Sequence, residues 1–187
     1  MLLCDIDGVL GDWDGAAERL LGKPPQDLPK SQVWKAIEQE GFKFWADMEP
    51  LPWARNFIIL LRQLDYVLVC SSPSLDPKSA AGKIKWMQKF FNDKSFKDFA
   101  LTPVKHTYAR PGVILIDDKE KHIDAFNQEG GTGILFPTRF NRNKRYSDDP
   151  AAYVVENLKS FYPLSRFPVD FDLDKETADF NVKDFYD

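Results

Sequence analysis

Two carboxylates stand two residues apart close to the N-terminus, in the sequence Asp5-Ile6-Asp7-Gly8. They follow the apolar run Met1–Cys4, which is typical of a short buried strand, and the glycine allows a tight turn directly after them. Because residues i and i+2 of an extended chain point to the same side, Asp5 and Asp7 can converge on one point. Two converging carboxylates repel each other, so either one keeps a proton or a cation joins them. Taken alone, the pattern is equally compatible with a strand that ends in an acidic turn.

Further polar groups recur downstream at matching places. In chain order they are Ser71 and Ser72 after the apolar run Tyr66–Cys70, Lys83, Lys105, and Asp117 and Asp118 after the apolar run Val113–Ile116. Each group has an ordinary explanation, because serines before a proline form turns, paired aspartates cap helices and lysines are mostly solvated. The carboxyl ends of the strands in an open α/β sheet meet at one edge, where ligands bind. The set as a whole therefore favours one shared site.

These residue types suit phosphoryl transfer. A carboxylate can attack phosphorus and carry the phosphoryl group covalently. A second carboxyl can protonate the leaving oxygen and later deprotonate the water that cleaves the acyl phosphate. Oxygen ligands around one point are those that Mg²⁺ prefers, and hydroxyl and lysine donors neutralise the phosphoryl oxygens.

The elements that must position these residues follow from the apolar runs. Near-continuous apolar stretches, without alternation, are typical of parallel strands that are covered on both faces. They predict strands at Leu2–Ile6, Tyr66–Cys70, Val113–Ile116 and Gly133–Phe136. Helical spacing of apolar residues predicts helices between them, at Trp53–Leu64, Ser79–Phe91 and Lys119–Gln128. The alternation predicts an α/β fold with a doubly wound, Rossmann-like parallel sheet.

The segment 11–50 interrupts this alternation. It is too long for a simple strand-to-helix turn, and its helical patches Gly15–Leu21 and Ser31–Glu40 are separated by a proline-rich stretch. We therefore expect a small helical cap inserted after the first strand, with residues 1–10 and 51–165 forming the α/β core. Residues 166–187 form an acidic C-terminal tail, for which a packed tail, a partner-binding peptide and a weakly ordered end all remain open.

The composition limits the classes of function. The net charge of −4 makes a sequence-independent nucleic-acid binder improbable, because such proteins need a basic surface. The sequence contains no apolar run long enough to span a membrane, and no leader segment is expected before the first strand. The two cysteines, Cys4 and Cys70, each have apolar neighbours and predict buried reduced thiols, consistent with the cytoplasm.

At this point the motifs resemble a known family. The segment DIDGVL (residues 5–10), the serine pair, a lysine and IDD (residues 116–118) occur in the order of the four motifs of the haloacid-dehalogenase-like phosphatase superfamily. Closer similarity is to its 5′(3′)-deoxyribonucleotidase branch, through the segments Met48–Pro52, Ser71–Pro73, Lys83–Trp86, Leu101–Lys105 and Leu115–Lys119. The similarity runs from the N-terminus to about residue 140 and is weakest in the insertion.

The resemblance implies a role for each residue. Asp5 is the nucleophile and Asp7 the general acid and base. Ser71, Ser72 and Lys83 contact phosphate, and Lys105 is the motif lysine. Mg²⁺ is the implied cofactor, held by the Asp5 carboxylate, the Asp7 backbone carbonyl and one of Asp117 and Asp118, with the direct ligand of that pair left open.

The insertion occupies the position where this superfamily selects substrates. The resemblance places a base-stacking aromatic at Trp13, with Trp34, Phe44 and Trp45, and also Phe42, as further candidates for a base pocket. The alternative is that these aromatics form the core of a small helical cap. The basic cluster Arg139, Arg142, Lys144 and Arg145 is interpreted as a solvated loop, and His106 and His122 lack metal-ligand spacing.

The leading hypothesis is a Mg²⁺-dependent phosphomonoesterase that acts on (deoxy)ribonucleoside monophosphates through an aspartyl-phosphate. A second hypothesis keeps the chemistry but changes the substrate to a sugar phosphate or a polynucleotide end. A third is a binding module that keeps the fold without turnover. The partner expected is a small nucleotide, with no membrane involved, and the chain is either a monomer or a homodimer.

Overall fold

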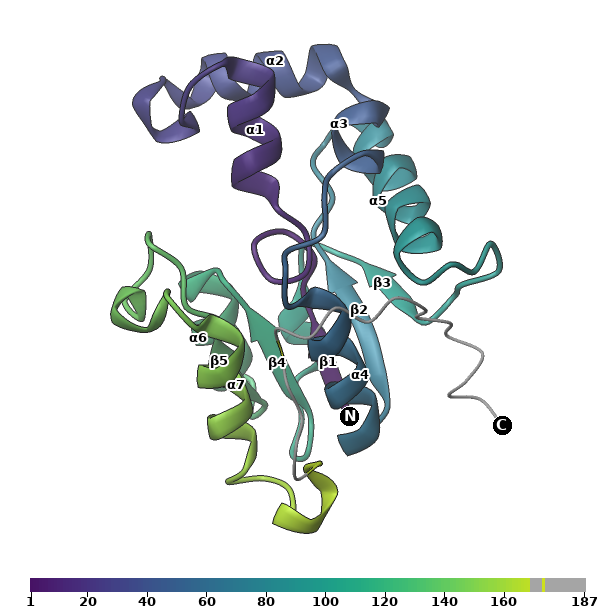
Figure 1. Cartoon of the computed structure of the whole chain (residues 1–187), viewed down its shortest axis with the longest axis vertical. Coiled ribbons are helices and arrows are strands. Elements are labelled where there is room, and N and C mark those ends of the chain that lie inside the picture. The colour runs from purple at the N-terminus through teal and green to yellow at the C-terminus, as the bar shows by residue number, and fades with distance from the viewer. Residues whose placement is uncertain (169–172, 174–187) are drawn as a thin grey trace.

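The computed structural model describes residues 1–168 and residue 173. Within these residues, five parallel strands form one sheet in the order β3-β2-β1-β4-β5. Their bounds are β1 Leu2–Cys4, β2 Val67–Ser71, β3 Phe99–Leu101, β4 Ile114–Asp117 and β5 Thr132–Leu135. The chain begins in the middle of the sheet, adds β2 and β3 on one side and then β4 and β5 on the other. This order confirms the doubly wound α/β fold (Figure 1).

The sheet is covered on both faces, as the continuous apolar runs indicate. In β1, Leu2 and Cys4 pack into one hydrophobic cluster, whereas Leu3 between them packs into a second. In β4, Ile114 and Leu115 divide in the same way. Because successive side chains of a strand point to opposite faces, both sides of each central strand must be apolar.

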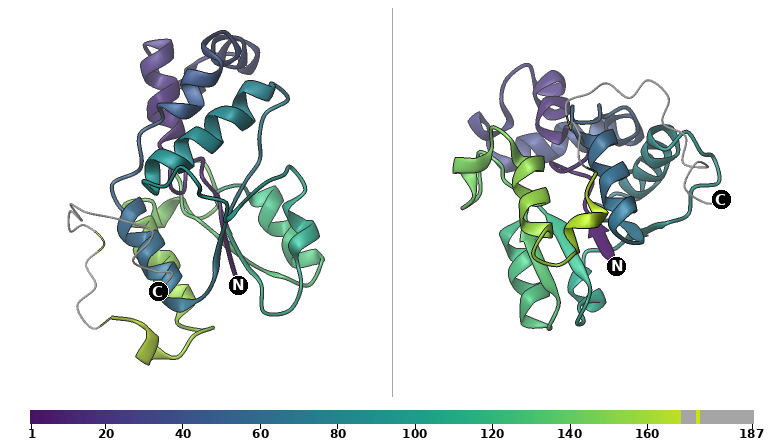
Figure 2. Two further views of the ribbon diagram at one scale, coloured as in Figure 1. Left: turned by 90° about the vertical axis from the view of Figure 1, so that its right-hand side faces the viewer. Right: turned by 60° about the horizontal axis from the view of Figure 1, so that its bottom comes forward.

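Four helices of the core provide this cover: α4 Ala54–Leu64, α5 Pro77–Phe90, α6 Glu120–Gln128 and α7 Pro150–Leu158. Helices α4 and α7 lie on one face of the sheet and α6 on the other (Figure 2). Short 3₁₀ helices complete the connections, at η2 Lys105–Tyr108, η3 Lys144–Tyr146 and η4 Leu164–Arg166.

The register of the sheet places the polar residues at one edge. Cys4 is level with Val69 of β2 and with Ile116 of β4. Asp5 therefore leaves β1 beside the ends of both neighbouring strands, and its N–H still donates to the Ile116 carbonyl at 3.0 Å. Strand β1 ends at Cys4, earlier than the sequence predicts, because the chain turns at once: the N–H groups of Leu10 and Gly11 both donate to the Ile6 carbonyl.

The insertion (residues 11–50) lies above the carboxyl ends of the strands (Figure 1). It consists of α1 Trp13–Leu21, η1 Pro25–Asp27, α2 Lys30–Glu40 and α3 Phe42–Ala46. Helix α3 packs closely on α5, and Gly82 of α5 makes this approach possible. A Cβ at that position would lie 2.5 Å from the Trp45 Cβ and 2.8 Å from the Phe42 carbonyl. Gly82 thereby brings Trp45 next to the helix that carries Lys83.

Two elements of the core were not predicted. Strand β3 has only three half-buried residues at the edge of the sheet, which is too short for a periodic pattern. Helix α7 did carry a signal, because Ala151, Val154 and Leu158 have helical spacing and all three are buried. Helix α5 begins at Pro77, two residues before the predicted start, because the Asp76 side chain caps it.

The acidic tail predicted for 166–187 lies outside the described residues, except for 166–168 and 173. In the part of the chain that the structure describes, no helix is both long enough and apolar enough to cross a membrane.

Candidate active site

Asp5 is held in a buried position at the end of β1. The residue is 4% exposed, and its Oδ1 accepts the N–H of Ile6 at 2.7 Å. The Nζ of Lys105 lies 2.9 Å from the same oxygen. Burial raises the pKa of Asp5, and the nearby charge of Lys105 opposes this rise. The lysine therefore helps to keep the carboxylate ionised at this buried position.

Lys105 joins two strand ends. Besides Asp5, its Nζ donates to Asp117 Oδ2 at 2.6 Å, and the lysine itself is fully buried. Burial alone would lower the pKa of Lys105, but the charges of Asp5 and Asp117 raise it above its ordinary value. Burial likewise tends to raise the pKa of Asp117, but Lys105 and a hydrogen bond from His122 hold it below its usual range. The three groups form a charged cluster in which the lysine stays protonated.

Both carboxylate oxygens of Asp117 have partners among the described residues. Its Oδ1 accepts the N–H of Lys119 at 2.8 Å, and its Oδ2 accepts from Lys105 and contacts His122 Nδ1 at 2.9 Å. Asp118 differs, because Lys119 Nζ donates only to its Oδ2, at 2.7 Å. Asp118 Oδ1 is buried without a hydrogen-bond partner among the described residues. A buried acceptor without a partner costs free energy, which a cation would recover.

Carboxylate oxygens of Asp5, Asp117 and Asp118 lie within 4.8 Å of one another. All the possible metal ligands here are oxygens, and one of them, Asp118 Oδ1, has no hydrogen-bond partner in the described part of the chain. Such a ligand set fits a hard divalent cation such as Mg²⁺. Gly8 makes room for this arrangement. Its φ is +77°, and a Cβ there would lie 2.9 Å from Asp118 Oδ2.

Asp118→Asn is expected to abolish Mg²⁺-dependent stabilisation and to stabilise the metal-free protein above neutral pH. Burial raises the pKa of Asp118 to about 7; Lys119 opposes this shift, and Asp5 adds to it. A carboxyl whose pKa rises on folding stabilises the fold at low pH, and this contribution is lost as the pH rises through the folded value. An amide cannot ionise, so the gain in Tm should be several degrees at pH 8 and smaller at pH 6.

Thermal unfolding with and without MgCl₂, at both pH values, measures these effects. The exposed residue Asp148 provides a matched control, Asp148→Asn, which should behave as wild type. An equal Mg²⁺-dependent rise in Tm for wild type and Asp118→Asn would contradict a ligand role for this carboxylate.

Lys83 organises the other half of the site. Its Nζ donates to Asp7 Oδ2 at 2.5 Å, to Ser71 Oγ at 2.8 Å and to the Ser72 carbonyl at 2.9 Å. The same nitrogen lies 4.9 Å from the centre of the Trp45 ring, within the range of a cation–π contact. Asp7 keeps one buried oxygen, Oδ1, without a hydrogen-bond partner in the described residues. Lys83 therefore ties the second carboxylate to the serine turn and to the insertion.

A cavity of about 560 Å³ opens between the strand ends and the insertion. Asp5, Asp7, Asp118 and Ser72 line its floor. The remaining lining residues come from the insertion, from the loops after the strands and from the start of α6: Trp13, Asp14, Trp34, Trp45, Pro73, Ser74, Pro103, Lys119, Glu120, Lys121, His122, Thr138, Phe140 and Asn141, together with Gly8.

The structure brings most of the sequence-predicted site residues to this cavity or directly behind it. Four of these residues do not line the cavity: Ser71, Lys83, Lys105 and Asp117. Lys83, Lys105 and Asp117 each contact a lining residue, and Ser71 accepts a hydrogen bond from Lys83. Among the candidate base-pocket aromatics, Trp13, Trp34 and Trp45 line the cavity, whereas Phe44 is buried behind them. Phe44 packs edge-on against Trp45 at 4.9 Å and against Trp13 at 6.1 Å. It supports the aromatic wall from behind.

Three residues that contact Asp117 or Asp118 are not among those that the sequence predicts. His122 contacts Asp117, Lys119 pairs with Asp118, and the buried Asn141 donates to the Asp118 carbonyl at 3.0 Å. Lys119 stands directly after the aspartate pair, so proximity could have indicated it. His122 and Asn141 carry no such signal, because their contacts depend on how α6 and the loop after β5 fold back. All four residues of the basic cluster are exposed, as the interpretation as a solvated loop expects, and Arg142 among them pairs with Glu120 and Asp124 of α6.

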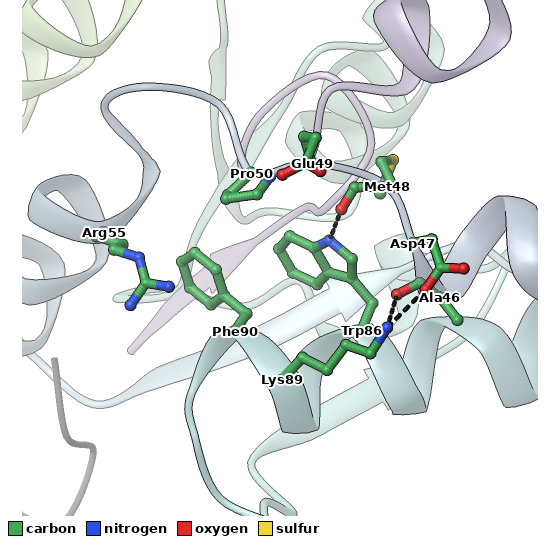
Figure 3. Close-up of a pocket in the computed structure, with 9 residues that line it drawn as sticks. All are labelled: Ala46, Asp47, Met48, Glu49, Pro50, Arg55, Trp86, Lys89 and Phe90. Atoms are coloured by element: carbon green, nitrogen blue, oxygen red, sulfur yellow. Dashed lines mark hydrogen bonds and ion pairs between the residues drawn. The ribbon is translucent and has the colours of Figure 1, made fainter. Parts of the chain in front are cut away.

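A second cavity of about 420 Å³ lies between helix α5 and the segment that leads from α3 to α4 (Figure 3). Residues 46–50, which lead from α3 to α4, form one wall, and Trp86, Lys89 and Phe90 of α5 with Arg55 form the rest. Lys89 Nζ bonds to the Ala46 carbonyl at 3.0 Å and to Asp47 at 2.6 Å, so its charge is already paired. None of the strand-end carboxylates reaches this cavity.

A doubly wound sheet with DxDG after its first strand, a buried lysine bridge and a second aspartate pair defines a haloacid-dehalogenase-like phosphatase. Comparison with known families gives the finer assignment. The family described as 5′ nucleotidase, deoxy (Pyrimidine), cytosolic type C protein matches residues 18–149. The match spans more than half of the chain, so this protein belongs to that family, and the resemblance to the 5′(3′)-deoxyribonucleotidase branch is confirmed. Asp5 and Asp7 precede the matched residues.

Among solved structures, a HAD hydrolase of family IA, variant 3, from Entamoeba histolytica HM-1:IMSS is similar, with 16% sequence identity and a TM-score of 0.40. The similarity covers 80% of this chain and 89% of that one. The comparison with curated proteins found no match.

Proposed function

We propose that this phosphatase hydrolyses (deoxy)ribonucleoside monophosphates with Mg²⁺ as cofactor. The observation that carries the proposal is the composition of a single cavity. Its floor holds Asp5, Asp7 and Asp118, and its wall holds three tryptophans from the insertion. The floor offers what a phosphoryl group needs, and the wall offers flat apolar surface for a nucleobase.

In the proposed reaction, Asp5 attacks phosphorus and the bond to the leaving sugar oxygen breaks. Asp5 has one oxygen engaged by Ile6 and Lys105, so its other oxygen is the one available for attack. Asp7 lines the cavity and protonates the leaving oxygen, for which its Oδ1 is suited because this atom has no partner in the described residues. Asp7 then takes a proton from the water that hydrolyses the aspartyl-phosphate, and inorganic phosphate is released.

Mg²⁺ would be held by Asp5, by the backbone carbonyl of Asp7 and by Asp118. The saturated hydrogen bonding of Asp117 supports Asp118 as the direct ligand and Asp117 as the group that positions Lys105. The ion would supply positive charge between the carboxylates and the phosphoryl oxygens. Ser72 lines the cavity and Lys83 lies behind it, which supports a role for both beside the phosphate.

The insertion serves in this proposal as the cap that selects the substrate, with Trp13 contacting the base. Trp13→Ala should raise KM for a nucleotide about 10-fold, because stacking of a base on an aromatic side chain contributes roughly 1–3 kcal/mol. KM for deoxyribose 5-phosphate, which has the same sugar phosphate but no base, should change little. Steady-state kinetics on both substrates test this, with Trp13→Phe as the conservative control. Equal changes in KM for both substrates would count against stacking.

A phosphate-release panel tests the proposed function. It compares dUMP, dTMP, other 5′- and 3′-nucleotides, sugar phosphates and a 5′-phosphorylated oligonucleotide, each with MgCl₂ and with EDTA. The proposal expects the highest kcat/KM for a nucleoside monophosphate and loss of activity with EDTA. If the enzyme prefers the sugar phosphates or the oligonucleotide, the proposed substrate class is wrong but the proposed phosphatase chemistry stands. No phosphate release from any compound in the panel would overturn the proposal.

A further inference from the structure

Phe140 is an exposed aromatic residue at the edge of the active-site cavity. Its exposed fraction is 62%, and it lies in the loop between β5 and α7. Among the exposed large apolar side chains of the described residues, Phe140 and Trp34 are the two that line this cavity. Within the described part of the chain, the Phe140 ring contacts no other aromatic ring, and Phe140 belongs to neither hydrophobic cluster.

The loop that carries Phe140 is firmly held. Asn141 is buried, and its amide donates to the carbonyls of Phe136 at 2.8 Å and Asp118 at 3.0 Å. Its Oδ1 accepts the N–H groups of Thr138 at 3.3 Å and Asn143 at 3.1 Å. Three of these bonds stabilise the loop internally. The bond to the Asp118 carbonyl connects the loop to the segment that carries the proposed metal ligand.

A second set of contacts fixes the far end of the loop. The N–H of Arg142 donates to Glu120 Oε1 at 2.6 Å, and its guanidinium pairs with Asp124 at 2.8 Å. Both acidic residues belong to α6. The backbone of the loop is therefore attached to the start of α6 close to Phe140, which keeps this residue at the edge of the cavity. Pockets for small ligands are lined mainly by apolar and aromatic side chains, so an aromatic ring at the edge of this cavity is in a position to contact a ligand.

The cavity has aromatic side chains on two walls that come from different parts of the fold. Trp13, Trp34 and Trp45 belong to the insertion, above the sheet, and Phe140 belongs to the segment between β5 and α7, which rises toward α1 (Figure 1). A flat group in the cavity would therefore have aromatic side chains from both parts of the fold among the residues available to contact it. The phosphoryl group would meanwhile reach Asp5 and Asp118 on the floor.

We propose that Phe140 is a specificity-determining residue that contacts the substrate's nucleobase from the core side, opposite the tryptophans of the insertion. The proposal rests on the nucleotidase function proposed above. It deepens that function, because it makes base recognition a property shared between the insertion and the anchored loop after β5. Sugar phosphates without a base would gain nothing from this residue.

The test compares kcat/KM for dTMP and for deoxyribose 5-phosphate in wild type and in Phe140→Ala. We expect about a 10-fold loss for dTMP and less than about a 2-fold change for deoxyribose 5-phosphate, in line with the loss of one stacking contact. Phe140→Tyr should retain wild-type values for both. Phe161→Ala is the matched control, because Phe161 is also exposed and does not line the cavity.

A second measurement needs no turnover of a nucleotide. Thymidine, which has no phosphate, should inhibit the hydrolysis of deoxyribose 5-phosphate competitively, and its Ki should rise about 10-fold in Phe140→Ala. Unchanged values for dTMP and for the thymidine Ki in a folded Phe140→Ala protein would overturn the inference while the nucleotidase function stands. If wild type hydrolyses deoxyribose 5-phosphate but not dTMP, and thymidine does not inhibit, both the proposed function and the inference fail.

Discussion

Asp5→Asn is expected to reduce kcat for nucleotides by about 10⁴-fold or more, the scale seen when a covalent nucleophile is removed. The amide nitrogen and oxygen cannot attack phosphorus as a carboxylate does, so no aspartyl-phosphate can form. The fold should tolerate the change, because an asparagine oxygen can still accept the Ile6 N–H, and Lys105 keeps its bond to Asp117. Phosphate release under saturating substrate and MgCl₂ measures the loss.

The control for this substitution is the same chemical change at an exposed position. Asp148→Asn alters neither cavity and should keep full activity. Thermal unfolding of Asp5→Asn should show a cooperative transition, which separates loss of chemistry from loss of fold. Wild-type kcat in this variant would rule out Asp5 as the nucleophile.

Asp7→Asn is expected to stop nucleotide turnover. The first chemical step, phosphorylation of Asp5, should still occur when the substrate has a good leaving group. General acid–base catalysis contributes about 10²–10⁴-fold, and the sugar oxygen of a nucleotide is a poor leaving group that needs the proton. The leaving group of p-nitrophenyl phosphate needs no proton, so phosphorylation of Asp5 should continue. Hydrolysis of the aspartyl-phosphate still needs the base. We therefore expect a burst of about one p-nitrophenol per active site, followed by slow turnover.

The structure supports a local effect for this second variant. The amide oxygen of the new side chain can accept the hydrogen bond that Lys83 donates to Asp7 Oδ2, and the backbone carbonyl of residue 7 is unchanged. Mg²⁺-dependent stabilisation should therefore persist in Asp7→Asn. Rapid-quench measurements give the burst amplitude, with Asp5→Asn as the control that should show none. Equal losses for nucleotides and p-nitrophenyl phosphate, without a burst, would contradict the role of Asp7.

The strand pattern of the core was predictable because it depends on local composition. Leu3 and Leu115 have to be apolar, since each lies on one face of a strand that is buried on both faces, and such runs are visible in the sequence. The edge strand β3 was not predictable. Its three half-buried residues follow no pattern of their own, and pairing with β2 defines them as a strand.

The residues capable of chemistry were also predictable. A carboxylate pair after one strand and a second pair after another must meet at the same edge of a parallel sheet, because the carboxyl ends of its strands lie together. Residue type and strand order are thus enough to place Asp5, Asp7, Asp117 and Asp118 in one site, and the resemblance to a family assigns their roles. The membership of that family is established by the match over residues 18–149.

The sequence by itself determined which side chains could do phosphoryl chemistry and on which edge of the sheet they gather, because both depend on residue type and strand order. The tertiary structure decided which partners each of these side chains has, and so which of two adjacent aspartates is available to bind a metal ion. Asp117 is saturated by Lys105 and His122, whereas Asp118 keeps an oxygen without a partner in the described residues. These contacts come from residues of other elements that the fold brings beside Asp117, so no local sequence pattern predicts them. For the same reason, only the folded chain shows that the anchored loop after β5 places Phe140 at the cavity.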